Sequence, residues 1–213
     1  MNVLLHFLAG IALWPAVEYA LHSGLGHLCL RGKTTFSREH LRHHAEKDFF
    51  APAWKKTVIA IPVFGMLLVL VSVLSPLDSA AALTLGFALM YATYESIHRR
   101  AHTHGPSHCG LLGRYSRWVR RNHFSHHFQN PRRNHGVTTP LFDYLFGTHV
   151  EPGKIIVPER FAMRWLCDPV TGDLWPNLAC DYELKKASAA SLRRRKDDTD
   201  DYNAAFAMRS PEH

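Results

Sequence analysis

Histidine is the residue whose spacing in this chain points most directly to chemistry. The pattern His-x-x-His-His occurs twice, in His40–His44 and in His123–His127. On a helix, positions i, i+3 and i+4 share one face, so the three imidazoles of each segment are expected to point at one centre. Neutral imidazole is a good ligand for zinc, copper, iron and nickel. The repeated spacing therefore predicts a metal site shared by the two segments.

Two looser histidine pairs accompany these segments. Four residues separate His22 from His27, and three residues, one helical turn, separate His98 from His102. The four segments together hold ten of the 16 histidines: His22, His27, His40, His43, His44, His98, His102, His123, His126 and His127. A zinc site needs three or four protein ligands. Ten nitrogens are too many for one ion and suit two ions with four or five nitrogens each.

The charged residues separate the chain into basic and apolar zones. All 25 lysines and arginines fall in the blocks 31–56, 99–133 and 154–209. Outside these blocks lie three apolar runs, Val3–Leu21, Val58–Leu74 and Ala80–Ile97. Each run is about long enough to cross the hydrocarbon core as a helix, or nearly so. The first run lacks the basic start and the small-residue cleavage site of a signal peptide, so it is expected to be a retained anchor.

The positive-inside rule orients these runs. If the basic blocks face the cytoplasm, all four histidine segments fall on that side. The net charge of +7 is then explained by anionic headgroups, with no need for nucleic acid. The sequence predicts an all-α integral-membrane fold, with about three transmembrane helices and a cytoplasmic helical cap that holds a histidine-rich dinuclear metal site.

Local signals refine this arrangement. Residues 1–184 are expected to form the membrane domain, and residues 185–213 a polar, flexible tail. Ser37 is the expected N-cap of the helix that carries His40. Gly24 and Gly26 are expected to loosen the helix after His22, so that His27 need not keep helical register with it. Four cysteines without Cys-x-x-Cys spacing indicate no disulfide framework.

Some polar residues near the histidines admit two interpretations. Glu18 and His22 are i,i+4 neighbours, so the Glu18 carboxylate is expected to hold the second ring nitrogen of His22. The alternative is an interfacial glutamate that faces water. His104 and His108, in a Gly/Pro/Ser loop, are expected to be solvated rather than spare ligands.

The nitrogen-rich ligand set limits the classes of metalloprotein that fit the sequence. Zinc hydrolases usually include carboxylates among their ligands, and carboxylate-bridged di-iron bundles use Glu-x-x-His pairs from four helices. Glu95 and His98 supply only one such pair. Histidine-held iron acting with dioxygen is therefore favoured, with the protein excluding water and positioning a C–H bond.

The four histidine segments, in this order and each beside an apolar run, resemble the fatty acid hydroxylase superfamily of integral-membrane di-iron oxygenases. That group includes sterol desaturases, fatty acid 2-hydroxylases and carotenoid hydroxylases. The stretch Asn134–Thr148 is similar to the one that follows the last histidine segment in the family. The resemblance covers residues 15–150, and the spacing of His98 and His102 is most like the fatty acid 2-hydroxylase pattern.

The resemblance implies that the ten histidines hold two iron ions, with no catalytic residue beyond these ligands. It also implies hydroxylation of a fatty acyl chain or related membrane lipid, using O2 and electrons from a separate donor of ferredoxin or cytochrome b5 type. A fused cytochrome b5 domain is not expected in a chain of this length. The expected location is the bacterial cytoplasmic membrane, with the site facing the cytoplasm.

Alternatives to lipid hydroxylation stay open at this level. A lipid or sterol desaturase, or a carotenoid hydroxylase, would use the same ligands. A non-catalytic, histidine-rich metal-binding membrane protein is an alternative of a different class. That alternative is disfavoured because transporters normally place ionisable ligands at mid-membrane, whereas these histidines lie at helix ends.

Overall fold

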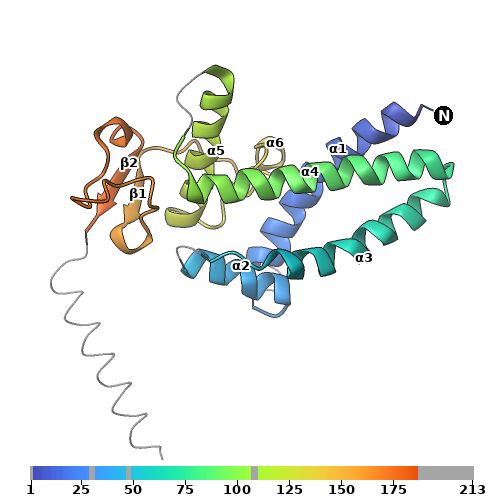
Figure 1. Ribbon diagram of the computed structural model, residues 1–213, viewed down its shortest axis with the longest axis horizontal. Helices are drawn as coiled ribbons and strands as arrows, with labels where there is room; N and C mark the ends of the chain where they lie inside the picture. The colour runs from blue at the N-terminus through green and yellow to red at the C-terminus, as the bar shows by residue number, and fades with distance from the viewer. Residues whose placement is uncertain (1, 29–31, 47–48, 107–109, 187–213) are drawn as a thin grey trace, which may run out of the picture.

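The computed structural model describes residues 2–28, 32–46, 49–106 and 110–186 (Figure 1). The elements are α1 (Val3–Tyr19), the π-helix η1 (Ala20–Leu28), α2 (Thr35–Ala45), α3 (Ala53–Ser72), α4 (Leu77–Thr103), α5 (Gly110–Phe128), α6 (Leu141–Leu145), β1 (Ile155–Pro158), the 3-10 turns η2 (Glu159–Phe161) and η3 (Pro176–Leu178), and β2 (Tyr182–Lys185). The fold is mostly helical, and the long helices α1, α3 and α4 extend away from the part of the chain that contains α5 and the strands (Figure 1).

Two helical segments in the described ranges are long and apolar enough to cross a membrane. They are Val3–His27, with 25 residues and a mean hydropathy of 1.5, and Ala53–Ser72, with 20 residues and 1.8. The second of these, α3, has no buried residue along its whole length. An apolar helix with no buried residue is typical of a helix that faces lipid along much of its surface. α4 is longer, at 27 residues, but is not in this set.

α1 and α4 pack with their backbones in close contact. A Cβ atom at Gly10 would lie 2.0 Å from the carbonyl oxygen of Leu83, and one at Gly86 would lie 2.1 Å from that of Phe7. Any larger residue at either position would push the helices apart. Small residues at a crossing are a common way for membrane helices to approach closely. This contact fixes the position of His98, on α4, relative to the end of α1.

The helix that carries the second histidine segment begins earlier than expected. Thr34, and not Ser37, is its N-cap, because the Thr34 side chain accepts a hydrogen bond from the Ser37 backbone N–H at 3.0 Å. Ser37 instead accepts from the Gly32 N–H through its own hydroxyl, at 2.7 Å. α2 is consequently longer by most of a turn at its N-terminal end.

The part of the chain that follows α6 departs from the all-α prediction. β1 and β2 form a parallel two-stranded sheet, in which Ile155 pairs with Tyr182. Buried Ile155, Val157 and Tyr182 pack in one cluster with Phe124 of α5. β2 includes Lys185, one residue past the predicted end of the membrane domain at 184. Apart from Lys185 and Lys186, the predicted tail lies outside the described residues.

Candidate metal centre

The ten histidines lie in two groups of five. Within each group, the candidate ligand nitrogens are all within 4.8 Å of one another. Group A consists of His22, His27, His40, His44 and His126. Group B consists of His43, His98, His102, His123 and His127. The groups adjoin, since the rings of His44 and His127 stack with their centroids 4.0 Å apart.

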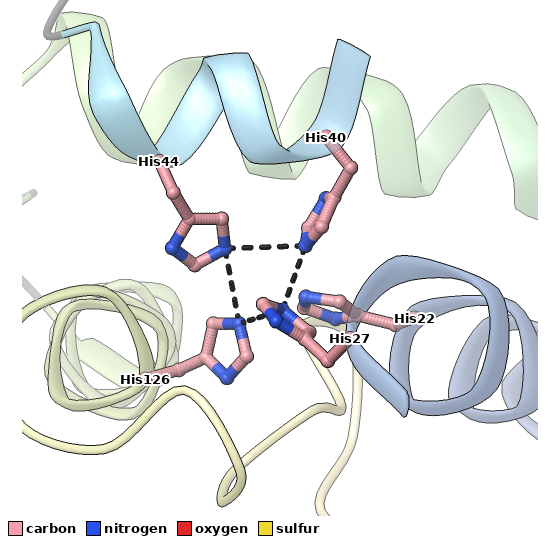
Figure 2. A group of neighbouring side chains, drawn as sticks. All are labelled: His22, His27, His40, His44 and His126. Carbon is pink, nitrogen blue, oxygen red and sulfur yellow. Dashed lines mark hydrogen bonds between the residues drawn. The ribbon is translucent and has the colours of Figure 1, made fainter. Parts of the chain in front are cut away.

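The nitrogens of group A surround a common point (Figure 2). Nε2 of His27 lies 2.8 Å from that of His40 and 3.0 Å from that of His126. The Nε2 atom of His44 closes the ring, at 3.1 Å from His40 and 3.2 Å from His126. Two nitrogens bound at about 2.1 Å to one ion, at a right angle, would lie about 3 Å apart. The spacing therefore fits nitrogen ligands of a single ion.

Group B repeats this spacing. Nε2 of His98 lies 3.0 Å from that of His43, and Nε2 of His102 lies 2.9 Å from that of His123. Nε2 of His127 in this group and Nε2 of His22 in group A are buried without a hydrogen-bond partner. Leaving a buried polar atom unsatisfied is costly. A metal ion in each group would satisfy both nitrogens.

The two His-x-x-His-His segments do not each converge on one centre, as the spacing had suggested. In α2, His40 and His44 belong to group A and His43 to group B; in α5, His123 and His127 belong to group B and His126 to group A. The reason is helical geometry. Residues i and i+4 project 40° apart, while the remaining histidine projects about 60–100° away from them. Each segment thus contributes to both groups, which holds them side by side.

The pair His22 and His27 is aligned by a π-helix. The α-helical hydrogen bonding of α1 changes over Ala20–Leu28 to the i→i+5 pattern. Residues five apart then share a face, so both histidines reach group A. The chain stays helical through Gly24 and Gly26 but widens to the π form, so His27 leaves α-helical register with His22 as predicted. Gly26 also makes room for a ligand, since a Cβ there would lie 3.0 Å from the His40 ring.

Backbone carbonyls hold the second ring nitrogens. Nδ1 of His126 lies 2.8 Å from the Arg133 oxygen, and Nδ1 of His43 lies 2.8 Å from that of Phe49. Nδ1 of His22 makes a short contact with the His135 oxygen. A carbonyl can only accept, so in each case Nδ1 carries the proton and Nε2 keeps its lone pair free for a metal.

The Glu18 carboxylate is buried but does not contact His22. It accepts hydrogen bonds from the Trp14 indole N–H at 3.1 Å and from the backbone N–H and hydroxyl of Thr138. It also accepts from the Val137 N–H. Glu18 therefore fixes the loop whose His135 carbonyl holds His22, and its support for that ligand is indirect. Glu95, which precedes His98, pairs with Lys56.

Sequence reasoning missed the side chains that shape this loop. Asp143 is fully buried and accepts from the backbone N–H groups of His135 and Gly136 at 2.8 and 2.7 Å. Asn122 donates to the Gly136 carbonyl at 2.8 Å. The signal lay in the stretch Asn134–Thr148, where an acidic residue stands within an otherwise apolar segment.

Burial keeps the histidines neutral. It lowers the pKa of His43 to about 4. Burial, with smaller effects from neighbouring histidines, also lowers the pKa of each of the other histidines on α2 and α5, namely His40, His44, His123, His126 and His127. The neutral form is the one that binds metal. His104 is exposed and belongs to neither group, and His108 lies outside the described residues.

An apolar cavity of about 230 Å³ reaches both groups. His22 and His40 of group A and His43 and His98 of group B line one part of it. Apolar and aromatic residues from α1, α3 and α4 line the rest, among them Trp14, Ile59, Val63, Phe64, Phe87 and Tyr91. Two ion pairs that join neighbouring helices also lie on its wall, Lys55–Glu39 and Lys56–Glu95.

Apolar helices that carry paired histidine groups at one end define a membrane protein with a candidate dinuclear centre. Comparison with known proteins agrees. The family model described as fatty acid hydroxylase matches residues 7–148. This chain belongs to the fatty acid hydroxylase family.

The similar proteins include named lipid hydroxylases. The chain is 26% identical over 164 residues to fatty acid 2-hydroxylase of Rattus norvegicus, covering 72% of this chain and 40% of that protein. It is 28% identical over 154 residues to the ceramide very long chain fatty acid hydroxylase of Saccharomyces cerevisiae, covering 68% and 38%. The solved hydroxylase domain of full-length scs7p matches with a TM-score of 0.54 at 25% identity, covering 71% of this chain and 59% of that one. The chain spans less than two thirds of each of these proteins.

Proposed function

We propose that this protein is a membrane-bound di-iron oxygenase that hydroxylates a C–H bond of a fatty acyl chain, using O2 and external electrons. The observation that carries the proposal is the meeting of two five-histidine groups with an apolar cavity. The ten histidines of groups A and B would hold the two iron ions. When bound, iron would supply the activation of dioxygen.

The donor set favours iron over a hydrolytic zinc centre. Neither group contains a carboxylate or a thiolate among the described residues. Imidazole suits several transition metals, but a pair of adjoining sites that contact an apolar cavity offers little to hydrolysis, which needs water. The chain's own contribution would be to hold ten neutral imidazoles in place, to keep water out, and to orient the substrate.

The cavity supports an acyl chain as the substrate. Its wall is mostly apolar, and its aromatic part, with Phe64, Phe87 and Trp14, is formed by the long helices. The charged pairs on the same wall, contributed by Lys55 and Lys56, would face the polar part of a lipid. The acyl tail would then run between the helices, with a carbon near its polar end at the metals. Hydroxylation at position 2 is the reaction named for the rat relative.

The membrane arrangement follows from the same helices. We propose that α1, α3 and α4 all cross the bilayer and that the histidine groups lie on the cytoplasmic side, where the basic blocks are found. A separate donor protein of ferredoxin or cytochrome b5 type would dock on this basic face. The relatives named above are eukaryotic, and assignment to a bacterial cytoplasmic membrane stays a prediction.

The test is lipid mass spectrometry on host cells that express the full chain under isotopically labelled O2. The wild type and His104→Ala, whose side chain is exposed and outside both groups, are expected to give a lipid with one added labelled oxygen. His126→Ala should give none. Loss of two hydrogens would instead establish a desaturase. If His126→Ala gave as much labelled lipid as the wild type, the proposal that group A takes part in hydroxylation would be wrong.

A further inference from the structure

The short helix α6 exposes an apolar surface outside the long helices. Leu141, Tyr144, Leu145 and Phe146 are between 59% and 68% exposed. Contiguous exposed apolar residues on a folded surface usually mark a place that another molecule covers.

This surface is rigidly held. Between the exposed residues, Asp143 is fully buried and accepts hydrogen bonds from the N–H groups of His135 and Gly136 and from the Thr148 hydroxyl, at 2.7–2.8 Å. α6 is therefore attached on one side to the loop at His135 and Gly136, whose His135 carbonyl holds His22 of group A. Its apolar side chains point outward because the polar side is used for this attachment.

The surface continues that of α1. The Tyr19 ring stacks on Phe146 with centroids 5.1 Å apart, and its hydroxyl lies 3.1 Å from that of Thr148. Figure 1 shows α6 beside α1, in agreement with the contacts between them. Tyr19 is the last residue of α1 and lies within Val3–His27, one of the two segments apolar enough to cross a membrane. The exposed residues of α6 thus lie beside the end of α1, in the part of that segment nearer to the histidines.

The residues around α6 have the chemistry of a membrane interface. The Arg133 guanidinium donates to the carbonyl of Gly147, next to Phe146, and Arg132 is exposed. Aromatic side chains prefer the headgroup level, and arginines there pair with lipid phosphates. A bilayer would match both features, because its acyl region covers apolar residues continuous with α1 and its headgroups pair with arginine.

We propose that α6 and the turn through Gly147 are immersed in the headgroup and upper acyl region of the bilayer, where lipid covers Leu141, Tyr144, Leu145 and Phe146. The insertion would fix the depth of the loop that holds His22, and so the height of group A above the acyl chains. The proposal goes beyond the proposed hydroxylase function, because it depends only on which molecules contact α6.

The test is site-specific photocrosslinking of the full chain in host membranes. The photoreactive residue benzoylphenylalanine replaces Leu145, and adducts are identified by mass spectrometry. Val69, which is 63% exposed on α3, is the positive control for lipid contact. Val170, which is 90% exposed between η2 and η3, measures the lipid labelling that solvent exposure alone gives. We expect lipid adducts at positions 145 and 69 and none at 170. Tyr144 is a second position, where the aromatic replacement is closest in shape to the native residue.

Three results would overturn the proposal. The first is a lipid adduct at position 69 with none at 144 or 145. The second is crosslinking of 144 or 145 to a second copy of the chain or to another protein. The third is an equal lipid yield at position 170, because exposure would then explain the labelling. None of these results depends on whether the chain hydroxylates a lipid.

Discussion

Groups A and B have the same number of histidines but are built on different supports. Group A takes its ligands from η1, α2 and α5, and three of its five histidines are only partly buried. Group B takes them from α2, α4 and α5, and four of its five are buried. Group A also depends on the loop that Glu18 and Asp143 hold in place. Because fewer of its ligands are buried and one of them depends on a loop, we expect group A to hold metal more weakly than group B.

Loss of one ligand from either group should have the largest effect. In both His126→Ala (group A) and His123→Ala (group B) we expect hydroxylation to fall at least about 100-fold, more than changing an outer-shell partner usually costs. Each variant should keep one iron, because the other group is intact. Lipid mass spectrometry and elemental analysis measure the two effects. Near-normal activity with one iron would break the claim that the groups act together.

Glu18→Gln should weaken group A alone. The substituted amide has one oxygen, so it cannot accept from both the Trp14 indole N–H, which the carboxylate binds through Oε2, and the Val137 backbone N–H, which it binds through Oε1. The loop at His135 should loosen, with a loss of iron affinity of roughly 10–100-fold in group A. Competition with a chelator measures it, and the exposed Glu46→Gln is the control. An unchanged affinity would show that Glu18 has no part in holding His22.

The π-helix supplies a matched pair of smaller changes. Gly26→Ala would bring a methyl group to 3.0 Å from the His40 ring, whereas Gly24→Ala meets nothing within 4 Å. We expect Gly26→Ala to release the iron of group A several-fold faster than wild type, and Gly24→Ala to leave the rate unchanged. Equal release from both variants would mean that crowding at His40 is not the cause.

pH should have the smallest effect. Five histidines at the ordinary pKa of about 6.5 would weaken binding by about three orders of magnitude between pH 8 and pH 6. Since burial lowers the pKa of His43 to about 4 and lowers that of His126 as well, we expect less than about a tenfold change. The metal-free fold binds fewer protons than the unfolded chain, so its stability should decline only as pH falls below about 6.5 towards the folded-state pKa. A steep loss of iron affinity above pH 6 would contradict this.

The sequence identified the clustered histidines better than it predicted how they divide between two groups. Periodic spacing identifies which histidines share a helix face, and it led to the ten residues that the structure gathers. It did not predict that His43 and His126 would each join a different group from the other two histidines of their segment. Which group a histidine joins depends on how α2 and α5 face each other. That is a tertiary contact and not a local one.

Two further features depended on distant contacts. The π-helix at His22 and His27 reads in sequence as a glycine-loosened helix, since no residue type specifies an i→i+5 pattern. Glu18 had His22 as its neighbour one turn away, yet its partners lie about 120 residues further on, at Val137 and Thr138. The strands β1 and β2, four residues each, are too short for periodicity to reveal.

The presence of two iron sites is tested by titrating the metal-free full chain, in lipid bilayers and without oxygen, with ferrous iron. We expect two iron ions to bind per chain, the first in group B and the second, more weakly, in group A. We further expect that, when samples from the titration are supplied with O2 and an electron donor, hydroxylating activity appears only as the second ion binds. Saturation at one iron, or full activity after the first equivalent, would contradict it.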